Sequence, residues 1–147
     1  MKVTAALAGV RWLFLDTAPV IYHVEGNAVY QPATDEIFQT ISDGRCEAIT
    51  SSITLTECLV HPYRRADAAL AQRFEDVIIA GANTRYVGVD AVATPAAQLR
   101  ARYNLTLGDS LQIAAALAAG CDAFLTNDKR LKRITELTVL VLEELET

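Results

Sequence analysis

The 147-residue sequence is poor in cysteine and histidine, which narrows the kinds of site it can build. Its three cysteines, Cys46, Cys58 and Cys121, are widely spaced and form no C-x-x-C pair, so they indicate neither a disulfide framework nor a zinc knuckle. The only histidines are His23 and His61, and Cys58 with His61 is too small a set of ligands for a zinc site. Catalytic or metal chemistry is therefore expected from other side chains.

The sequence also lacks a long apolar run and a glycine-rich phosphate loop. The longest uncharged stretch, 110–121, has 12 residues, whereas a membrane-spanning helix needs about 18 or more. Neither G-x-x-x-x-G-K-[ST] nor G-x-G-x-x-G occurs, so nucleotide-dependent chemistry gains no support. Hydrophobic residues make up 52% of the chain, which is too apolar for disorder. We expect one cytoplasmic domain over residues 1–147, with no contact to a membrane.

The apolar patterning indicates alternating short strands and helices. Strands are predicted at residues 12–15, 48–50, 86–89, 123–126 and 139–142, and helices at 18–24, 34–41, 53–60, 66–80, 95–103 and 110–119. Strands that are apolar on both faces and separated by helices predict an α/β fold, with a mostly parallel sheet covered on each side.

Four carboxylates fall where such a sheet places ligands. Asp16 and Asp128 lie at the ends of two predicted strands, and the carboxyl ends of parallel strands are where ligands bind. Glu57 lies in the helix after a third strand, and Asp109 begins an alanine-rich helix. Because crowded carboxylates repel one another, they require protons or a cation, and all-oxygen ligands suit Mg²⁺ or Mn²⁺.

Each acid also has a purely structural interpretation. Asp109 can be the N-cap of its helix, and Asp16 and Asp128 can be ordinary turn residues. Glu57 can simply face solvent. The four together are harder to explain in this way than each one alone.

Four segments, in this order and spacing, resemble the PIN-domain family. They read FLDTAPVIY at 14–22, ITSSITLTEC at 49–58, LGDSLQIAAA at 107–116 and FLTNDKRL at 124–131. The resemblance covers almost the whole chain after Arg11 and is to the small VapC-like toxin ribonucleases. It implies a three-layer α/β/α fold with a mostly parallel sheet of about five strands.

The resemblance also implies a Mg²⁺- or Mn²⁺-dependent endoribonuclease. Its acidic ligands match Asp16, Glu57, Asp109 and Asp128, and its supporting residues match Thr17, Thr126 and Asn127. An RNA substrate, a cognate antitoxin of a type II toxin–antitoxin pair and a homodimer are implied in the same way. Because both histidines lie outside the four segments, we expect a metal-bound water to supply the nucleophile.

One departure from the family pattern keeps a second interpretation open. Ala18 stands where Asn or Ser is common, which removes a polar contact but no ligand. The alternative is therefore a PIN-like module that binds RNA or protein with little or no turnover.

The net charge of −5 argues against a general basic surface for nucleic acid. Setting aside the four candidate ligands and the glutamates at 143, 144 and 146 leaves 11 acidic against 13 basic residues. Lys129 and Arg130 directly follow Asp128, so we expect them to contact the phosphates of bound RNA.

Overall fold

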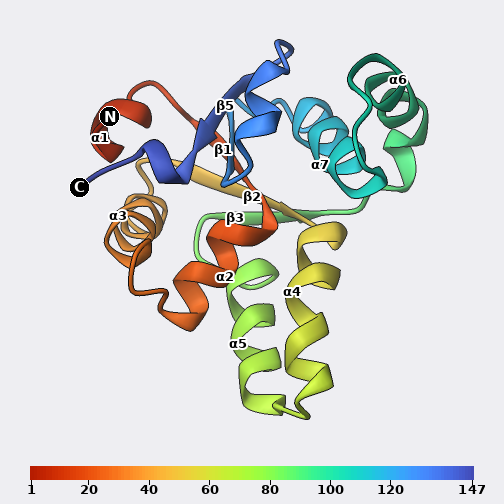
Figure 1. Ribbon diagram of the computed structural model, residues 1–147. Coiled ribbons are helices and arrows are strands. Elements are labelled where there is room, and N and C mark those ends of the chain that lie inside the picture. The colour runs from red at the N-terminus through yellow and green to blue at the C-terminus, as the bar shows by residue number, and fades with distance from the viewer.

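Five parallel strands form the centre of the computed structural model, which describes all residues from 1 to 147 (Figure 1). In the order β3-β2-β1-β4-β5, they are β1 (Trp12–Leu15), β2 (Glu47–Ser51), β3 (Thr84–Val87), β4 (Ala123–Thr126) and β5 (Thr138–Val141). From the central β1 the chain builds outward to β3, then returns to the other side of β1 for β4 and β5. The order of the strands therefore reverses between β1 and β4, where open α/β sheets bind ligands.

Helices cover both faces of the sheet, which confirms the predicted three-layer fold. One apolar cluster joins the sheet to α1 through α5, and the other joins it to α6 and α7. The helices are α1 (Val3–Ala6), α2 (Thr17–Glu25), α3 (Gln31–Ser42), α4 (Ser52–Arg64), α5 (Ala68–Ile78), α6 (Ala93–Tyr103) and α7 (Leu107–Ala118), with short 3₁₀ turns η1 (Asp90–Val92), η2 (Lys129–Arg133) and η3 (Leu142–Glu144). None of the helices has the length and apolar character needed to span a bilayer.

Side chains of β1 alternate between the two apolar clusters. Leu13 and Leu15 pack in the cluster with α1 through α5, whereas Phe14 packs in the cluster with α6 and α7. There Phe14 stacks on Phe124 of β4, with ring centroids 5.1 Å apart. Successive side chains of a strand point to opposite faces, so a strand covered on both sides must be apolar throughout.

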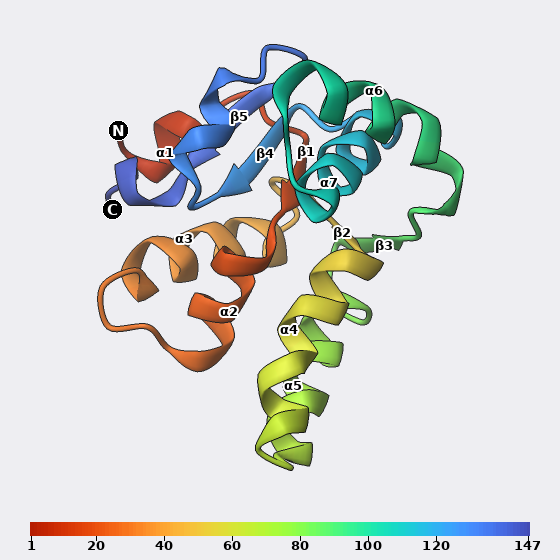
Figure 2. The ribbon, with the colours of Figure 1, turned by 45° about the vertical axis from the view of Figure 1, so that its right-hand side comes forward.

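Several predicted element boundaries are wrong. Strand β3 begins two residues before the predicted start at residue 86, because its pairing with β2 places Thr84 opposite Ala48. Helix α4 continues beyond the predicted end at residue 60 and includes Pro62, which is buried. It packs beside α5, and the two helices extend together away from the sheet (Figure 2).

Candidate functional site

An open pocket of about 330 Å³ lies beside the carboxyl ends of β1 and β4. All four predicted acids line this pocket, although they come from four separate segments of the chain. Ala18 and the predicted supporting residues line it as well, so its lining includes Asp16, Thr17, Ala18, Glu57, Asp109, Thr126, Asn127 and Asp128. Neither histidine is part of it.

Asp16 accepts hydrogen bonds at both of its carboxylate oxygens. Its Oδ1 accepts a hydrogen bond of 2.8 Å from the Thr17 amide, which makes it the N-cap of α2. Its Oδ2 accepts a hydrogen bond of 2.8 Å from the Thr126 hydroxyl of β4. Burial raises the pKa of Asp16 to about 6, with a smaller contribution from the charges of Asp109 and Glu57, and the two hydrogen bonds oppose this rise. Asp16 is thus a capping residue, and it is also a desolvated acid beside other acids.

Glu57, in α4, is linked to Asp16 by Thr17, which donates a hydrogen bond to each of them. The Thr17 hydroxyl donates a hydrogen bond of 3.3 Å to Glu57 Oε1. Burial, and then the charge of Asp109, raise the pKa of Glu57. A Cβ on Gly108 would lie 3.8 Å from Glu57 Oε1, so the first turn of α7 is in van der Waals reach of this carboxylate. Glu57 therefore faces the pocket between α2 and α7.

Asp109 lies in the first turn of α7 and does not cap it. Thr106 is the N-cap, because its hydroxyl accepts a hydrogen bond of 3.2 Å from the Asp109 amide. The helix consequently begins at Leu107, before the predicted start at residue 110, and the N-cap interpretation of Asp109 is wrong. Burial, together with the charge of Asp128, raises the pKa of Asp109, although Thr106 and Arg130 oppose this rise.

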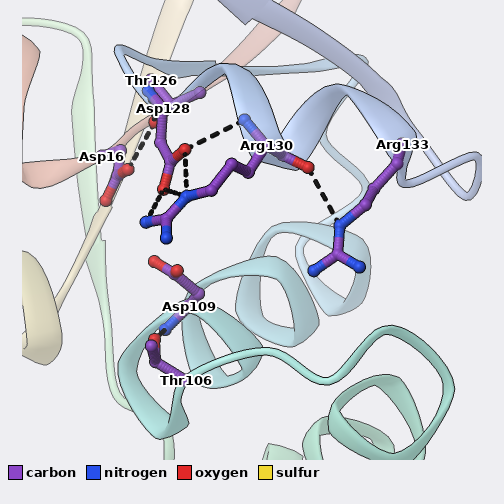
Figure 3. A network of polar contacts seen from close by, with 7 residues as sticks. All are labelled: Asp16, Thr106, Asp109, Thr126, Asp128, Arg130 and Arg133. Atoms are coloured by element: carbon purple, nitrogen blue, oxygen red, sulfur yellow. Dashed lines mark hydrogen bonds and ion pairs between the residues drawn. The ribbon is translucent and has the colours of Figure 1, made fainter.

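Asp128 is engaged by Arg130, two residues further along the chain (Figure 3). The guanidinium donates from Nε to Oδ1 at 2.9 Å and from Nη2 to Oδ2 at 2.7 Å, and these bonds lower the pKa of Asp128. The Asp109 carboxylate faces the same guanidinium from the opposite side. Arg130 therefore acts as a cation within the acidic site, between two of the four candidate ligands.

The donor set fits a divalent metal ion, although it is not gathered as a finished metal centre. No three carboxylate, imidazole or thiol groups are close enough together to coordinate one ion. An ion would have to compete with Arg130 for Asp128. It would also lower the raised pKa values of Asp16, Glu57 and Asp109, because a nearby positive charge favours the ionised form. Carboxylates and hydroxyls of this kind suit Mg²⁺ or Mn²⁺.

The basic run that follows Asp128 is largely paired with acids. Lys129 lies 3.4 Å from Glu143, and Lys132 lies 2.8 Å from Glu144. Arg133 has no carboxylate partner, and it lines a smaller hollow beside Asp109 and Asp128 together with Arg130. Arg133 was not among the predicted site residues, although its position in the same basic run was an available signal.

Sequence reasoning also missed Gln112, which lies behind the pocket. Gln112 is 1% exposed, and its Nε2 is 3.5 Å from Asp16 Oδ1 and 2.7 Å from Thr54 Oγ1. It comes three residues after Asp109 in α7, a spacing that places both residues on one side of the helix. The only amide side chain of α7, in a stretch that is otherwise apolar after Ser110, was the signal that could have revealed it.

A family model of the PIN domain matches residues 13–137. The chain belongs to the PIN domain family. All four acids of the pocket lie within the matched residues of this PIN domain. A comparison with curated proteins finds no match.

Solved structures of toxin–antitoxin systems share the fold of this PIN domain. VapBC2 from Rickettsia felis, bound to a promoter DNA fragment, matches with a TM-score of 0.71 and 18% identity over 88% of this chain and 98% of that chain. VapC20 from Mycobacterium tuberculosis, a toxin that cleaves the sarcin-ricin loop, matches with a TM-score of 0.68 and 14% identity over 86% and 98% of the two chains. A toxin–antitoxin complex from Klebsiella pneumoniae matches with a TM-score of 0.65 and 20% identity over 88% of this chain and 97% of that chain. These similarities establish the common architecture.

Proposed function

We propose that this PIN domain is a divalent-metal-dependent endoribonuclease, with Asp16, Glu57, Asp109 and Asp128 holding Mg²⁺ or Mn²⁺. One observation carries the proposal: four carboxylates from four separate segments line a single pocket, and burial raises the pKa values of three of them. Acids kept together against their mutual repulsion are typical of a site for a cation. The membership in the PIN family supports the same chemistry.

A divalent ion held by the four carboxylates would supply hydroxide from bound water near neutral pH and would offset charge on the departing oxygen of a phosphodiester. The protein keeps the ligands in place for this reaction. The Thr17 amide and the Thr126 hydroxyl hold the two oxygens of Asp16, and the Thr17 hydroxyl holds Glu57. Asn127 accepts a hydrogen bond of 2.9 Å from the Glu143 amide, which anchors the loop that carries Asp128.

We assign the binding of RNA phosphates to basic side chains around η2. Arg133 forms no ion pair with a carboxylate, and Arg130 becomes available for phosphate when it leaves Asp128. Lys129 is paired with Glu143, and both side chains are more than half exposed, so opening this ion pair costs little free energy. All three cations can then bind phosphate, which positions the RNA without reading its sequence.

We also assign this chain the role of toxin in a type II toxin–antitoxin pair, with a cognate antitoxin as partner and a homodimer as its assembly. The support comes from the similar structures, several of which are toxin–antitoxin complexes. Expression of the chain alone should arrest growth, and co-expression of the antitoxin should relieve the arrest. Unimpaired growth with accumulated folded protein would contradict the toxin role.

Replacement of Asp109 by asparagine tests the nuclease. D109N should abolish Mn²⁺-dependent cleavage of a mixed RNA pool, because the change removes one ligand charge and preserves the shape of the side chain. Asp90→Asn is a matched control, because Asp90 is exposed and lies outside the pocket. Cleavage by the wild-type protein should stop when the metal is chelated. Equal cleavage by D109N and wild type would refute the assignment.

The alternative function is RNA or protein binding with little turnover. Ala18 lines the pocket without a polar side chain, and Arg130 already occupies Asp128, and both features favour this alternative. In the same experiment, a wild-type protein that binds the RNA pool but leaves it intact with Mn²⁺ would establish the binding module and exclude the nuclease.

A further inference from the structure

A chain of buried hydrogen bonds lies beneath the acidic pocket and is centred on Gln112. The Gln112 Oε1 accepts a hydrogen bond from the Ser51 hydroxyl, and its Nε2 donates to Thr54 Oγ1 and to Asp16 Oδ1. Ser51 and Thr54 are completely buried. All the hydrogen-bonding groups of this amide are therefore used within the protein.

Each hydroxyl and amide in this series of hydrogen bonds can be assigned as donor or acceptor in only one way. Ser51 Oγ accepts from the amides of Ile53 and Thr54, so its own proton is left for Gln112 Oε1. Thr54 Oγ1 donates to the Leu15 carbonyl, so it must accept from Gln112. Both constraints turn the N–H groups of Gln112 toward Asp16. A flipped amide would place its oxygen against the carboxylate and leave the N–H groups facing a donor.

The same side chain connects three segments that each carry an acid. Gln112 belongs to α7, which carries Asp109, and it contacts Asp16 at the end of β1. Through Ser51 and Thr54 it also contacts the start of α4, and this helix carries Glu57 further along. The position of this one amide therefore affects how three carboxylates sit relative to one another.

We propose that Gln112 is a positioning residue, which orients the Asp16 carboxylate and fixes the start of the Glu57 helix relative to α7, and so sets the affinity of the site for divalent metal. This inference rests on the metal binding of the proposed function. Gln112 lies behind Asp16 and does not line the pocket, so it acts through the acids and not as a ligand. Partners that orient metal ligands typically change metal affinity by about 10- to 100-fold when they are mutated.

The test compares the dissociation constant for Mn²⁺ among purified variants, measured by electron paramagnetic resonance and calorimetry without RNA. Gln112→Met preserves the shape of the side chain and removes its hydrogen bonds, and it should weaken Mn²⁺ binding about tenfold or more. Thr54→Val removes the acceptor that orients the amide without touching a carboxylate, and it should weaken binding in the same direction by a smaller factor. Thermal unfolding in a chelator reports the stability of each variant separately.

Thr50→Val is the matched control. Thr50 is completely buried beside Ser51 in β2, and its hydroxyl donates a hydrogen bond of 2.7 Å to the Ile78 carbonyl and not to a residue of the pocket. The variant should unfold at a lower temperature yet bind Mn²⁺ as tightly as wild type. A merely structural role for Gln112 predicts that Q112M and T50V behave alike.

The outcomes separate this inference from the proposed function. If the wild-type protein binds no Mn²⁺, the proposed function fails and the inference fails with it. If wild type binds Mn²⁺ and Q112M binds it equally well, only the inference is overturned. If Q112M does not fold, T54V decides: weaker Mn²⁺ binding than in T50V supports the inference, and equal binding overturns it.

Discussion

Replacing Asp16 with asparagine should make the metal-free protein more stable at neutral pH, although it removes a proposed ligand. Burial is the main cause of the raised pKa of Asp16, so ionisation of this carboxyl in the folded protein is costly. The neutral amide avoids that cost. Active sites commonly reduce stability in this way, and their neutral variants are then more stable than wild type.

The sign and size of the effect follow from the pKa of Asp16. The folded-state pKa is raised from 3.8 to about 6, so the folded protein binds more protons than the unfolded chain within this window. Stability is therefore greatest at the acidic end, falls as the pH rises through the window, and stays at the lower level above it. A displacement of this size is worth about 3 kcal/mol. Asparagine still accepts from the Thr17 amide but is a weaker partner for Thr126, so we expect D16N to gain about 1 to 3 kcal/mol.

Urea unfolding in a chelator, from about pH 4 to about pH 8, measures this difference. The stability of D16N minus that of wild type should be near zero at the acidic end, rise toward about pH 6 and then remain level. Burial lowers the pKa of His23, which makes stability rise with pH, but both proteins contain His23 and the difference cancels its effect. Adding Mn²⁺ at neutral pH should stabilise wild type more than D16N. A difference that does not change with pH, or a less stable D16N at neutral pH, would refute the reasoning.

Two further substitutions test the cation in the site and the packing behind it. Arg130→Gln releases Asp128 and should tighten Mn²⁺ binding about two- to fivefold, measured by calorimetry. Lys132→Gln loses an equal charge, which is paired with Glu144, and should leave Mn²⁺ binding unchanged. Unchanged Mn²⁺ binding in R130Q would show that Arg130 does not compete with the ion. Ala116→Leu places a larger side chain at a completely buried position of α7 and should lower the free energy of unfolding in urea by about 1 to 3 kcal/mol. Ala118→Leu, at an exposed position of the same helix, should lower it little. Equal stabilities of the two variants would contradict the tight packing of this helix.

The central strands could be predicted from the sequence because their burial has a simple consequence. Strands β1 and β4 have the predicted bounds, since both are covered on two faces and read as apolar runs up to Thr126 at the end of β4. Strand β3 lies at the edge of the sheet with partly exposed side chains, so the apolar pattern placed it two residues too late. The start of α7 depends on Thr106, a cap that precedes the apolar part of the helix. Such boundaries are set by single hydrogen bonds, which the apolar pattern does not register.

The convergence of the four acids on one pocket could be predicted because each lies at a strand end, in the helix directly after a strand, or at the start of an apolar helix. Their neighbours could not, because these contacts join distant parts of the chain. Gln112 meets Ser51 across 61 positions. Lys129 meets Glu143 because β4 pairs with β5, which brings the turns after both strands side by side. The charge count made from the sequence sets the C-terminal glutamates aside, whereas two of them pair with lysines that follow Asp128.

This pairing alters the electrostatic argument for RNA binding. With Lys129, Arg130 and Lys132 all paired, only Arg133 in this run offers an uncompensated charge to a phosphate. The metal-free pocket therefore combines several carboxylates with little free positive charge, and it should repel RNA. Under the proposed function, Arg130 leaves Asp128 when that carboxylate binds a divalent ion. One exchange then lowers the negative charge of the pocket and frees a guanidinium for phosphate, so metal binding and RNA binding favour each other.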